Sequence, residues 1–485
     1  MGWRMSHDSD RIIVCGGGLA GLSAAVTALQ AGAKVTLIEK APELGGTASV
    51  SGGLIWTFGD YEVARAKVPH GDPALQWLVF DSIDESRAWL QTLGVKLGPM
   101  EERVLEHGRG QSVEPAQMIE ALAKRFSALG GETLLETALE SLILSGGVVR
   151  GVRTLRDGRV AELPGGAVIL ATGGFQGNPE LLARYVLNDP DNLILRANPW
   201  STGDGFMAAT QVGAAVSPGL DNFYGHALAA PPARYSRFQF RDVTQYHGSL
   251  SVALNLDGVR FADETGGPGE EALNQQLARQ RGGRGVYIVD DDAMELHPNQ
   301  GRETITRTIL ARARSVGGTV IEAATLEELC EGFPALGIPA ERALASLREF
   351  NTVMESARAD ALKPGRLQHR KPLVKPPFHA VAVKAAITFT MGGLQIDERA
   401  RVLWRAGGTS PFAQVPESRA YVDTERSVVA IGSDYRQMPI RGLYAAGNDA
   451  GNISHFGYMG GLASALTVGR TAGANATVLV QSSSE

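Results

Sequence analysis

Three glycines early in the chain form the pattern best suited to bind a reactive cofactor. Gly16, Gly18 and Gly21 are spaced as GxGxxG at the junction between a predicted strand and a predicted helix. At such a junction the first glycine permits a tight turn, the second lets the backbone approach a pyrophosphate, and the third lets the helix pack against the strand. The helix start adds N–H groups and the positive end of its dipole, and Glu39 is placed to bind ribose hydroxyls. The pattern predicts a dinucleotide site.

The elements that must position this site form a predicted βαβ unit. The β-branched runs at 12–15 and 34–38 predict two strands, and the small residues between them predict a helix over 19–31. Parallel strands joined in this way imply a doubly wound sheet. Helices are also predicted at 73–93, 115–128, 325–331 and 340–357, and short strands at 133–136, 142–144, 148–155 and 168–171. The predicted fold class is α/β, with a Rossmann-like dinucleotide-binding domain.

The composition is that of an ordinary globular protein. The chain has 485 residues, of which 44% are hydrophobic and 20% are charged. Its 46 Lys and Arg residues and 52 Asp and Glu residues give a formal net charge of −6, without a long run of either sign. We therefore expect no nucleic-acid partner, because such binding needs a basic surface. The length exceeds that of one typical domain and predicts two.

The cysteines and the apolar stretches predict the compartment. Cys15 and Cys330 are far apart and have no metal-ligand spacing, so we expect neither a disulfide framework nor a metal site. The stretch between Arg11 and Lys34 is uncharged and long enough to resemble a membrane span, but its glycine break favours a strand followed by a helix. Residues 1–10 lack the apolar core of a signal peptide. We therefore expect a cytoplasmic protein without a membrane span.

The character of the sequence changes between about 216 and 376. Aromatic, His, Pro and Arg residues become more common there, and helical segments alternate with irregular stretches. After it, short strands and glycine turns return, and a final helix is predicted after Gly460 and Gly461. We predict a discontinuous dinucleotide-binding domain at 1–215 and 377–485, with an inserted α+β cap domain at 216–376 that contacts the substrate.

Six motifs, in order along nearly the whole chain, carry a family resemblance. They are ELGGTASVSGG at 43–53, ATGGF at 171–175, TGDG at 202–205, GVRFADE at 258–264, TMGG at 390–393 and GLYAAGN at 442–448. The series resembles the FAD-dependent fumarate reductase and succinate dehydrogenase flavoprotein superfamily. This resemblance implies a FAD-binding domain split around a mobile cap, with the substrate held between them over the flavin ring.

The resemblance also implies which residues contact FAD. The glycines after Tyr458 would bring backbone N–H groups and a helix N-terminus to the O2/N1 edge of the flavin, where they stabilise its anionic reduced form. Succinate dehydrogenases of this superfamily attach the flavin through a histidine in the region of 46–53, and this chain has none there. We therefore expect non-covalent FAD, and a single fingerprint predicts no built-in NAD(P)H domain. The cofactor-binding residues carried over are Gly16, Gly18, Leu19, Ala20, Gly21, Glu39, Lys40, Gly45, Gly46, Thr47, Ala48, Ser51, Gly52, Gly53, Ala138, Ala171, Thr172, Gly173, Asp204, Gly447, Asn448, Gly461, Leu462 and Ala463.

Three departures from the fumarate reductases bear on the substrate. Pro268 stands where those enzymes have a proton-donating arginine, and Phe389 stands where they have a carboxylate-binding histidine. The stretch 446–461 lacks the arginine that they carry there. A dianionic substrate needs several cationic donors, so these departures argue against fumarate or succinate. With Asn448 in its AAGN motif and Tyr458 before the last glycines, the sequence resembles the 3-ketosteroid dehydrogenase branch more closely.

That branch implies dehydrogenation of a carbon–carbon bond beside a carbonyl group. A base removes the α-proton, the β-hydrogen leaves as hydride to the flavin, and a hydrogen-bond donor stabilises the developing enolate. Tyrosine and histidine can fill the roles of base and donor. The catalytic candidates are Tyr458, His455, Tyr246, His247, Tyr224 and His226, and the substrate-pocket candidates are Phe389 and Arg109. A structural alternative stays open for each, because the tyrosines and histidines can pack the cap interface and the arginine can lie in a solvated loop.

The predicted function is that of an FAD-dependent dehydrogenase or ene-reductase for a largely apolar cyclic ketone or enone, with a 3-ketosteroid as the prototype. Its partners would be this small carbonyl substrate and an electron acceptor or donor that the sequence does not identify. Two alternatives stay open: a reductase or dehydrogenase for a carboxylate bound by an arginine, and a non-catalytic flavin-binding protein for electron transfer or regulation. The motif with Arg260, Asp263 and Glu264 is shared across different substrates, which favours a structural ion pair or a hinge.

Overall fold

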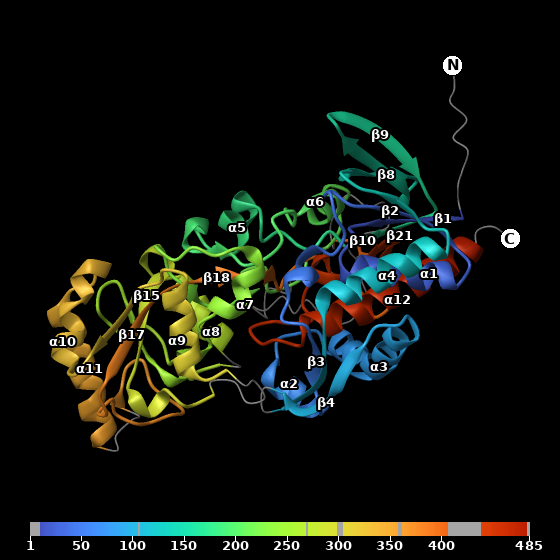
Figure 1. Cartoon of the computed structure of the whole chain (residues 1–485). Helices are drawn as coiled ribbons and strands as arrows, with labels where there is room; N and C mark the ends of the chain where they lie inside the picture. The colour runs from blue at the N-terminus through green and yellow to red at the C-terminus, as the bar shows by residue number, and fades with distance from the viewer. Residues whose placement is uncertain are drawn as a thin grey trace, which may run out of the picture.

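The computed structural model of the chain describes residues 10–104, 107–267, 270–297, 304–356, 361–405 and 438–482. Its elements form two lobes joined by short strands and connecting segments (Figure 1). One lobe holds both ends of the described chain and the largest sheet, and the other is built from the middle of the chain.

The larger lobe is built on a sheet that has nine strands within the described residues. Their order is β6-β2-β1-β10-β21-β8-β7, with β20 beside β21 and β9 beside β8. The strands are β1 (Arg11–Cys15), β2 (Lys34–Ile38), β6 (Glu132–Leu134), β7 (Ala138–Ser145), β8 (Val148–Arg156), β9 (Arg159–Pro164), β10 (Ala167–Leu170), β20 (Arg401–Leu403) and β21 (Pro439–Ala445). The pairs from β6 to β8 are parallel, which confirms the α/β Rossmann-like fold.

The central strands of this sheet are apolar along their whole length. All of β10 is buried, as is all of β1 after its first residue. Continuous apolar runs of this kind are typical of parallel strands buried on both faces. The helices α1 (Leu19–Gln30), α4 (Pro115–Ala128) and α12 (Gly461–Ser482) lie side by side against the sheet (Figure 1).

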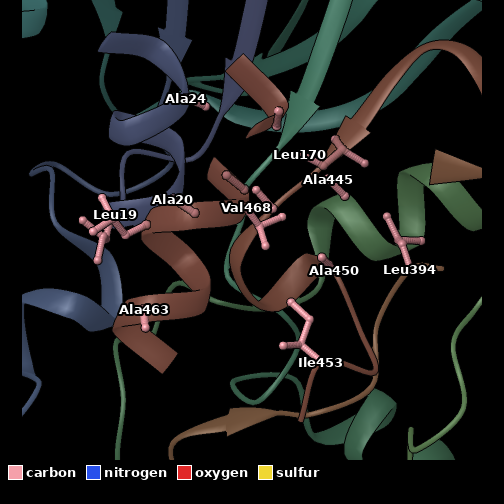
Figure 2. Packing of buried hydrophobic residues seen from close by; sticks show 14 of the residues in the cluster. Leu19, Ala20, Ala24, Leu170, Leu394, Ala445, Ala450, Ile453, Ala463 and Val468 are labelled. Atoms are coloured by element: carbon pink, nitrogen blue, oxygen red, sulfur yellow. The ribbon is translucent and has the colours of Figure 1, made fainter. Parts of the chain in front are cut away.

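Helices α1 and α12 approach each other through residues with little or no side chain. A Cβ atom added at Gly469 would lie 2.4 Å from the Ala20 carbonyl oxygen, and one at Gly473 would lie 2.3 Å from that of Ala24. Figure 2 shows Ala20, Ala24 and Val468 among the buried hydrophobic residues of the core. The order of these contacts makes the two helices run in the same direction. At 1.5 Å per residue, α12 begins about 10 Å before α1 along this shared direction.

The larger lobe also contains a small antiparallel sheet. It pairs β3 (Leu54–Phe58) with β5 (Gly108–Val113), and β5 with β4 (Leu97–Val104). Further helices of the chain before residue 215 are α2 (Tyr61–Lys67), α3 (Pro73–Thr92), α5 (Pro179–Tyr185) and α6 (Asp204–Gln211). Strand β3 matters for the site because it brings Trp56 to the start of α12.

The smaller lobe has an antiparallel sheet with five strands in the described part of the chain, ordered β13-β17-β15-β14 with β16 beside β17. The strands are β13 (Leu228–Ala229), β14 (Val252–Asn255), β15 (Arg284–Val289), β16 (Val320–Ala323) and β17 (Phe378–Lys384), and the helices are α7 (Phe240–Val243), α8 (Glu270–Ala278), α9 (Thr306–Ser315), α10 (Leu326–Glu331) and α11 (Ala340–Glu355). The domain boundaries at 215 and 376 stay predictions. Strand β17 begins after the second of them and pairs with strands of this lobe.

Two ladders of two residues each connect the lobes. Strand β11 (Ile194–Leu195) runs parallel to β18 (Ala386–Ile387), and β12 (Phe223–Tyr224) runs antiparallel to β19 (Phe389–Thr390). Helix α8 holds both ladders through side chains. Asn274 donates to the Ala386 carbonyl oxygen at 2.9 Å and accepts from its N–H at 3.1 Å, and Gln275 donates to the Phe223 carbonyl oxygen at 3.0 Å. The two ladders and α8, which are far apart in sequence, are thereby held together by hydrogen bonds.

Among the described helices, none has the length and apolar character that crossing a membrane requires. The described residues likewise contain no group of three or more His, Cys, Asp or Glu side chains that could hold a metal ion. Cys15 and Cys330 are free thiols, and both are buried.

Candidate active site

A cavity of about 420 Å³ is lined by the start of α1, the start of α12 and residues of both lobes. The predicted cofactor-binding residues that line it are Gly16, Gly18, Leu19, Ala20, Glu39, Lys40, Gly46, Thr47, Ala48, Ser51, Gly52, Gly53, Ala171, Thr172, Gly173, Asp204, Gly447, Asn448, Gly461 and Leu462. Gly21, Gly45, Ala138 and Ala463 are not among the lining residues, although both chain neighbours of Ala138 are.

The GxGxxG turn has the geometry of a pyrophosphate site. Gly16 has a φ of 110°, and a Cβ atom there would lie 2.1 Å from the Ala171 carbonyl oxygen. At Gly21 a Cβ atom would lie 1.9 Å from the Gly16 carbonyl oxygen, so this residue lets α1 pack onto the turn rather than line the cavity. Gly18 is the N-cap of α1 and provides no side-chain cap. The first N–H groups of the helix are therefore left for a ligand.

Glu39 is held at the cavity wall by two backbone hydrogen bonds. Its Oε2 accepts from the Gly17 N–H and its Oε1 from the Ala41 N–H, both at 2.7 Å. Burial raises the pKa of Glu39, and the hydrogen bonds act in the opposite direction. A carboxylate oxygen has two lone pairs, so each oxygen can also accept from a ribose hydroxyl.

Lys40 and Asp204 join two distant parts of the cavity wall. Lys40 Nζ lies 2.9 Å from Asp204 Oδ1 and 2.5 Å from Thr202 Oγ1. The Thr202 hydroxyl also donates to Asp204 Oδ1 at 2.8 Å. The carboxylate predicted to contact FAD is thus neutralised by a lysine. Together they present hydrogen-bonding groups with little net charge to the cavity.

Asp449 is an organising residue that the sequence patterns did not reveal. Its side chain is fully buried and accepts from Thr172 N at 2.5 Å, Thr172 Oγ1 at 2.9 Å and Gly174 N at 3.1 Å. Burial raises the pKa of Asp449 to about 6, against the opposing effect of these hydrogen bonds. The carboxylate therefore fixes the ATGGF loop in the cavity wall. An acidic residue directly after the AAGN motif was the signal that could have found it.

Four aromatic rings form one end of the cavity. Tyr224 stacks on Tyr458 with ring centroids 4.0 Å apart, and on Phe389 with centroids 4.9 Å apart. Trp56 meets Tyr458 edge-on at 5.5 Å. The structure therefore brings together three predicted site residues, Tyr224, Tyr458 and Phe389. Trp56 was not predicted, because its sequence context is that of an ordinary buried strand residue. Such a wall favours a flat, largely apolar ligand.

The start of α12 lies against this aromatic end. Gly460 has a φ of 93°, and a Cβ atom there would lie 1.9 Å from the Trp56 carbonyl oxygen. Tyr458 Oη accepts from the Gly461 N–H at 2.7 Å, so that N–H is used within the chain. The next N–H, at Leu462, has no partner within the helix by helix geometry, and Leu462 lines the cavity.

Tyr224 also begins a polar chain that leads away from the rings. Its Oη lies 2.8 Å from Nε2 of His226, and Oε1 of Glu271 lies 3.9 Å from the same nitrogen. Tyr246 packs edge-on against His226 at 5.1 Å, and all four residues line the cavity. Burial raises the pKa of Tyr224 well above its usual value, and nearby Tyr458 and Glu271 add to the effect. Tyr224 is therefore a neutral phenol at neutral pH.

Two charged residues of this end were missed because their sequence context is ordinary. Glu271 lies in the first turn of α8, where acidic residues are common. Arg196 directly follows β11 and lines the cavity. Its Nη1 donates to Thr388 Oγ1 at 2.9 Å, and its Nε donates to Thr244 Oγ1 at 3.3 Å. The cavity therefore contains a guanidinium group, although the sequence lacks the arginines and the histidine expected at the fumarate reductase motifs.

His247 is one of three predicted candidates that do not line the cavity. It is fully buried and meets Tyr287 edge-on at 5.8 Å. Within the described residues neither of its ring nitrogens has a hydrogen-bond partner. Burial lowers the pKa of His247 to about 3, so its imidazole is neutral at physiological pH.

His455 and Arg109 are the other two candidates outside the cavity lining. The Nδ1 atom of His455 lies 3.0 Å from Asn452 Oδ1, and burial lowers the pKa of this histidine. Arg109 lies on β5, where its Nη1 is 3.3 Å from Asp84 Oδ2. The structure does not bring either residue to the aromatic end of the cavity.

The GVRFADE motif forms a buried ion cluster. Glu264 Oε2 lies 2.6 Å from Arg260 Nη2 and 2.9 Å from Arg366 Nη1. Arg260 also donates to the Pro364 carbonyl oxygen at 2.7 Å. These contacts join two segments of the smaller lobe, residues 260–264 and 364–366, which fits the structural ion pair expected for the motif. Pro268, one of the three departures from the fumarate reductases, lies outside the described residues.

The donor set of the cavity fits FAD. Two helices begin at one cavity and run in the same direction, one beside a glycine turn and the other beside aromatic rings. Their starts are offset by about 10 Å along this direction. The first would hold the pyrophosphate and the second the flavin edge, with Glu39 on the ribose.

The comparisons with known proteins agree with this assignment. The model of the FAD binding domain family matches residues 11–102 and 60–464 of the chain. These matches cover more than half of the chain and include both helix starts that line the cavity.

Two curated relatives cover nearly the whole chain at low identity. The probable fumarate reductase Ifc3 of Shewanella frigidimarina is 25% identical in an alignment 506 residues long, which covers 97% of this chain and 75% of that protein. The 4-oxocyclohexanecarboxylate 2-dehydrogenase of Sinomonas cyclohexanicum is 23% identical in an alignment 576 residues long, which covers 95% of this chain and 92% of that protein. Two other relatives are longer, and the chain spans only 50% and 45% of their lengths.

The solved structures show the same fold. The 3-ketosteroid delta1-dehydrogenase from Sterolibacterium denitrificans, in complex with 1,4-androstadiene-3,17-dione, has a TM-score of 0.71 and 17% sequence identity. The match covers 97% of this chain and 100% of that one. Together with the family match and the cavity, this shows that the chain belongs to the FAD binding domain family and, like these relatives, is an FAD-dependent oxidoreductase.

Proposed function

We propose that the chain dehydrogenates, or in reverse reduces, a carbon–carbon bond beside the carbonyl group of a small cyclic ketone. The observation that carries this proposal is the Tyr224 hydroxyl, which lies inside an aromatic cavity and 2.8 Å from the buried His226. The cavity wall suits a flat ring, and the hydroxyl–imidazole pair suits the movement of one proton. One relative acts, by its name, on 4-oxocyclohexanecarboxylate, which is a cyclic ketone.

Tyr224 and His226 move the proton in this proposal. When FAD is bound, it supplies the acceptor for the β-hydrogen, which leaves as hydride. Tyr224 Oη takes the α-proton while its own proton passes to Nε2 of His226. The neutral phenol is a weak base by itself, and the neighbouring imidazole makes the transfer possible. In the reduction direction the same two transfers run backwards.

Tyr458 and Glu271 assist this transfer. Tyr458 Oη accepts the Gly461 N–H at 2.7 Å, which makes its own proton a better donor to the substrate carbonyl oxygen. That donation stabilises the enolate that forms as the α-proton leaves. Glu271 Oε1, at 3.9 Å from His226 Nε2, stabilises the positive charge that the imidazole gains.

An anaerobic flavin-bleaching screen tests this function. The purified yellow protein is mixed with cyclohexanone derivatives, 3-ketosteroids, succinate and other short carboxylates, and the oxidised-flavin absorbance is followed. We expect bleaching by a cyclic ketone, because the cavity end pairs aromatic rings with a proton-transfer pair. Bleaching by succinate but by no ketone would overturn the proposal. A flavin that no compound bleaches, while dithionite does, would instead favour a non-catalytic flavin-binding protein.

We also propose that FAD is held without a covalent bond. No histidine occurs between residues 46 and 53, where the resemblance would place the attachment. We expect acid precipitation to leave the yellow colour in the supernatant and the intact protein mass to equal that of the polypeptide alone. A succinate dehydrogenase flavoprotein subunit serves as the covalent control. A yellow pellet and a mass increased by one FAD would show that the proposal is wrong.

The remaining proposals concern the surroundings of the enzyme. We propose that it works in the cytoplasm, since both cysteines are free thiols, as in a reducing compartment. Its electron partner lies outside the 485 residues of this sequence, because these residues carry a single dinucleotide fingerprint. The cap at 216–376 contributes Tyr224, His226 and Glu271 to the cavity, which supports its role in substrate contact.

A further inference from the structure

Arg196 is a cation of the cavity wall whose side chain, among the described residues, donates only to hydroxyl groups. Its Nη1 and Nε donate to Thr388 Oγ1 and Thr244 Oγ1 at 2.9 and 3.3 Å. In the part of the chain that the structure describes, no carboxylate lies within ion-pair distance of it. The buried arginines of the smaller lobe differ, since Arg260 and Arg366 both pair with Glu264.

The position of Arg196 is fixed next to the proposed reaction centre. Its N–H donates to the Ile387 carbonyl oxygen at 2.8 Å, which continues the β11–β18 ladder. The N–H of the next residue, Thr388, donates to the Tyr224 carbonyl oxygen at 2.7 Å, where the β12–β19 ladder begins. Burial raises the pKa of Tyr224, whereas the positive charge of Arg196 lowers it, so the two groups lie within electrostatic reach.

Two hydrogen-bond donors at this place lack an acceptor. Among the described residues nothing accepts from Nη2 of Arg196, and nothing accepts from the hydroxyl proton of Thr388. Both residues line the cavity. A half-buried guanidinium without an anion is unfavourable, and the planar fork matches the two oxygens of a carboxylate. These two donors are therefore available to an anionic group of a ligand.

We infer that Arg196, with the Thr388 hydroxyl, binds a carboxylate of the substrate, so that the substrate is a cyclic ketone carrying a carboxylate away from its carbonyl group. This rests on the proposed function, which places the ketone within reach of the hydroxyl groups of Tyr224 and Tyr458. A single guanidinium suits a monoanion. Such a substrate suits an aromatic cavity that is lined by one arginine, and the single carboxylate distinguishes it from the dicarboxylates.

Steady-state kinetics with two matched compounds tests the inference. The holoenzyme and the Arg196→Gln variant are each assayed with cyclohexanone and with 4-oxocyclohexanecarboxylate. We expect the wild type to have at least a tenfold lower KM for the keto acid. The variant should raise the KM for the keto acid by about 10- to 100-fold, with little change in kcat. Its kinetic constants for cyclohexanone should stay within threefold of the wild-type values. Arg196→Lys should recover part of the loss, and the exposed Arg159→Gln is the matched control.

Two results would overturn it. The first is equal use of both compounds by the wild type, because no carboxylate site would then contribute. The second is an equal fall in kcat for both compounds in Arg196→Gln, which would place the arginine on the enolate instead. Unchanged flavin content and unfolding temperature show that each variant is folded.

A binding measurement keeps this inference separate from the proposed function. Cyclohexanecarboxylate, which has no ketone, is titrated into the oxidised holoenzyme while the flavin spectrum or the heat is recorded. A Kd at least tenfold weaker in Arg196→Gln supports the carboxylate site even where no ketone bleaches the flavin. Equal binding by both proteins contradicts it even where ketones are good substrates.

Discussion

Replacing Tyr224 by phenylalanine is expected to lower the rate of flavin reduction by about 10²- to 10⁴-fold, the range for loss of a general acid or base. The variant removes the hydroxyl that lies 2.8 Å from His226 Nε2. It keeps the ring, and with it the stacking on Tyr458 and Phe389. The expected effect is therefore on kcat, with a small change in KM. Anaerobic stopped-flow reduction of the flavin by a ketone substrate measures it.

Matched variants show whether the effect belongs to the relay. Glu271→Gln keeps the shape of the side chain but removes the charge 3.9 Å from His226, so a smaller loss is expected. Tyr235→Phe removes a hydroxyl that donates to the Ala229 carbonyl oxygen and does not line the cavity. Its reduction rate should stay within twofold of wild type. A Tyr224→Phe enzyme as fast as wild type would remove Tyr224 from the mechanism.

Replacing Asp449 by alanine is expected to destabilise the chain by about 2 to 6 kcal/mol, at about 1 to 3 kcal/mol for each of two buried donors left unsatisfied, and to weaken FAD binding. The substitution leaves the N–H groups of Thr172 and Gly174 buried without an acceptor. These residues belong to the loop that lines the cavity, so the cofactor loses part of its wall. Urea unfolding and flavin retention on gel filtration measure the two effects. The exposed Asp81→Asn is the control, and equal stability and flavin content in Asp449→Ala would contradict this role.

The same carboxylate makes stability depend on pH in a definite direction. Its folded pKa of about 6 exceeds the usual value of 3.8. The stabilisation from its proton is therefore complete below about pH 4 and is lost as the pH rises through 6. Between pH 5 and 7.5 this group should cost about 1.4 kcal/mol of unfolding free energy. Asp449→Asn has no such titration, so the gap between the two unfolding curves should change by this amount.

Local patterns predicted the elements around the cofactor well. The helices expected at 19–31, 73–93 and 115–128 are observed at Leu19–Gln30, Pro73–Thr92 and Pro115–Ala128. Glycines or prolines mark their ends, and one face of each is apolar, so the information lies within the segment. The FAD motifs are similarly local, because each is a turn whose backbone needs glycine.

The catalytic end depends on contacts between distant segments, which no local pattern encodes. Tyr224 and Tyr458 stack although 234 positions separate them in the sequence. Tyr246 and His247 are neighbours, yet one lines the cavity and the other is sealed beside Tyr287. Arg196 has the sequence context of an ordinary charge at a strand end. Its role follows only from the ladder that places it beside Thr388.

The packing of α1 on α12 divides the molecule into a part that tolerates redesign and a part that does not. A methyl group at Gly469 or Gly473 would push the two helices apart, and with them the two helix starts that would hold the pyrophosphate and the flavin edge of FAD. The glycines at this contact between α1 and α12 therefore tolerate no larger residue without a shift of the helices. Arg196 and Thr388 directly follow the two strands of the β11–β18 ladder, away from the contact between α1 and α12. Single substitutions at Arg196 or Thr388 can therefore change the substrate preference without changing the FAD site formed by the starts of α1 and α12.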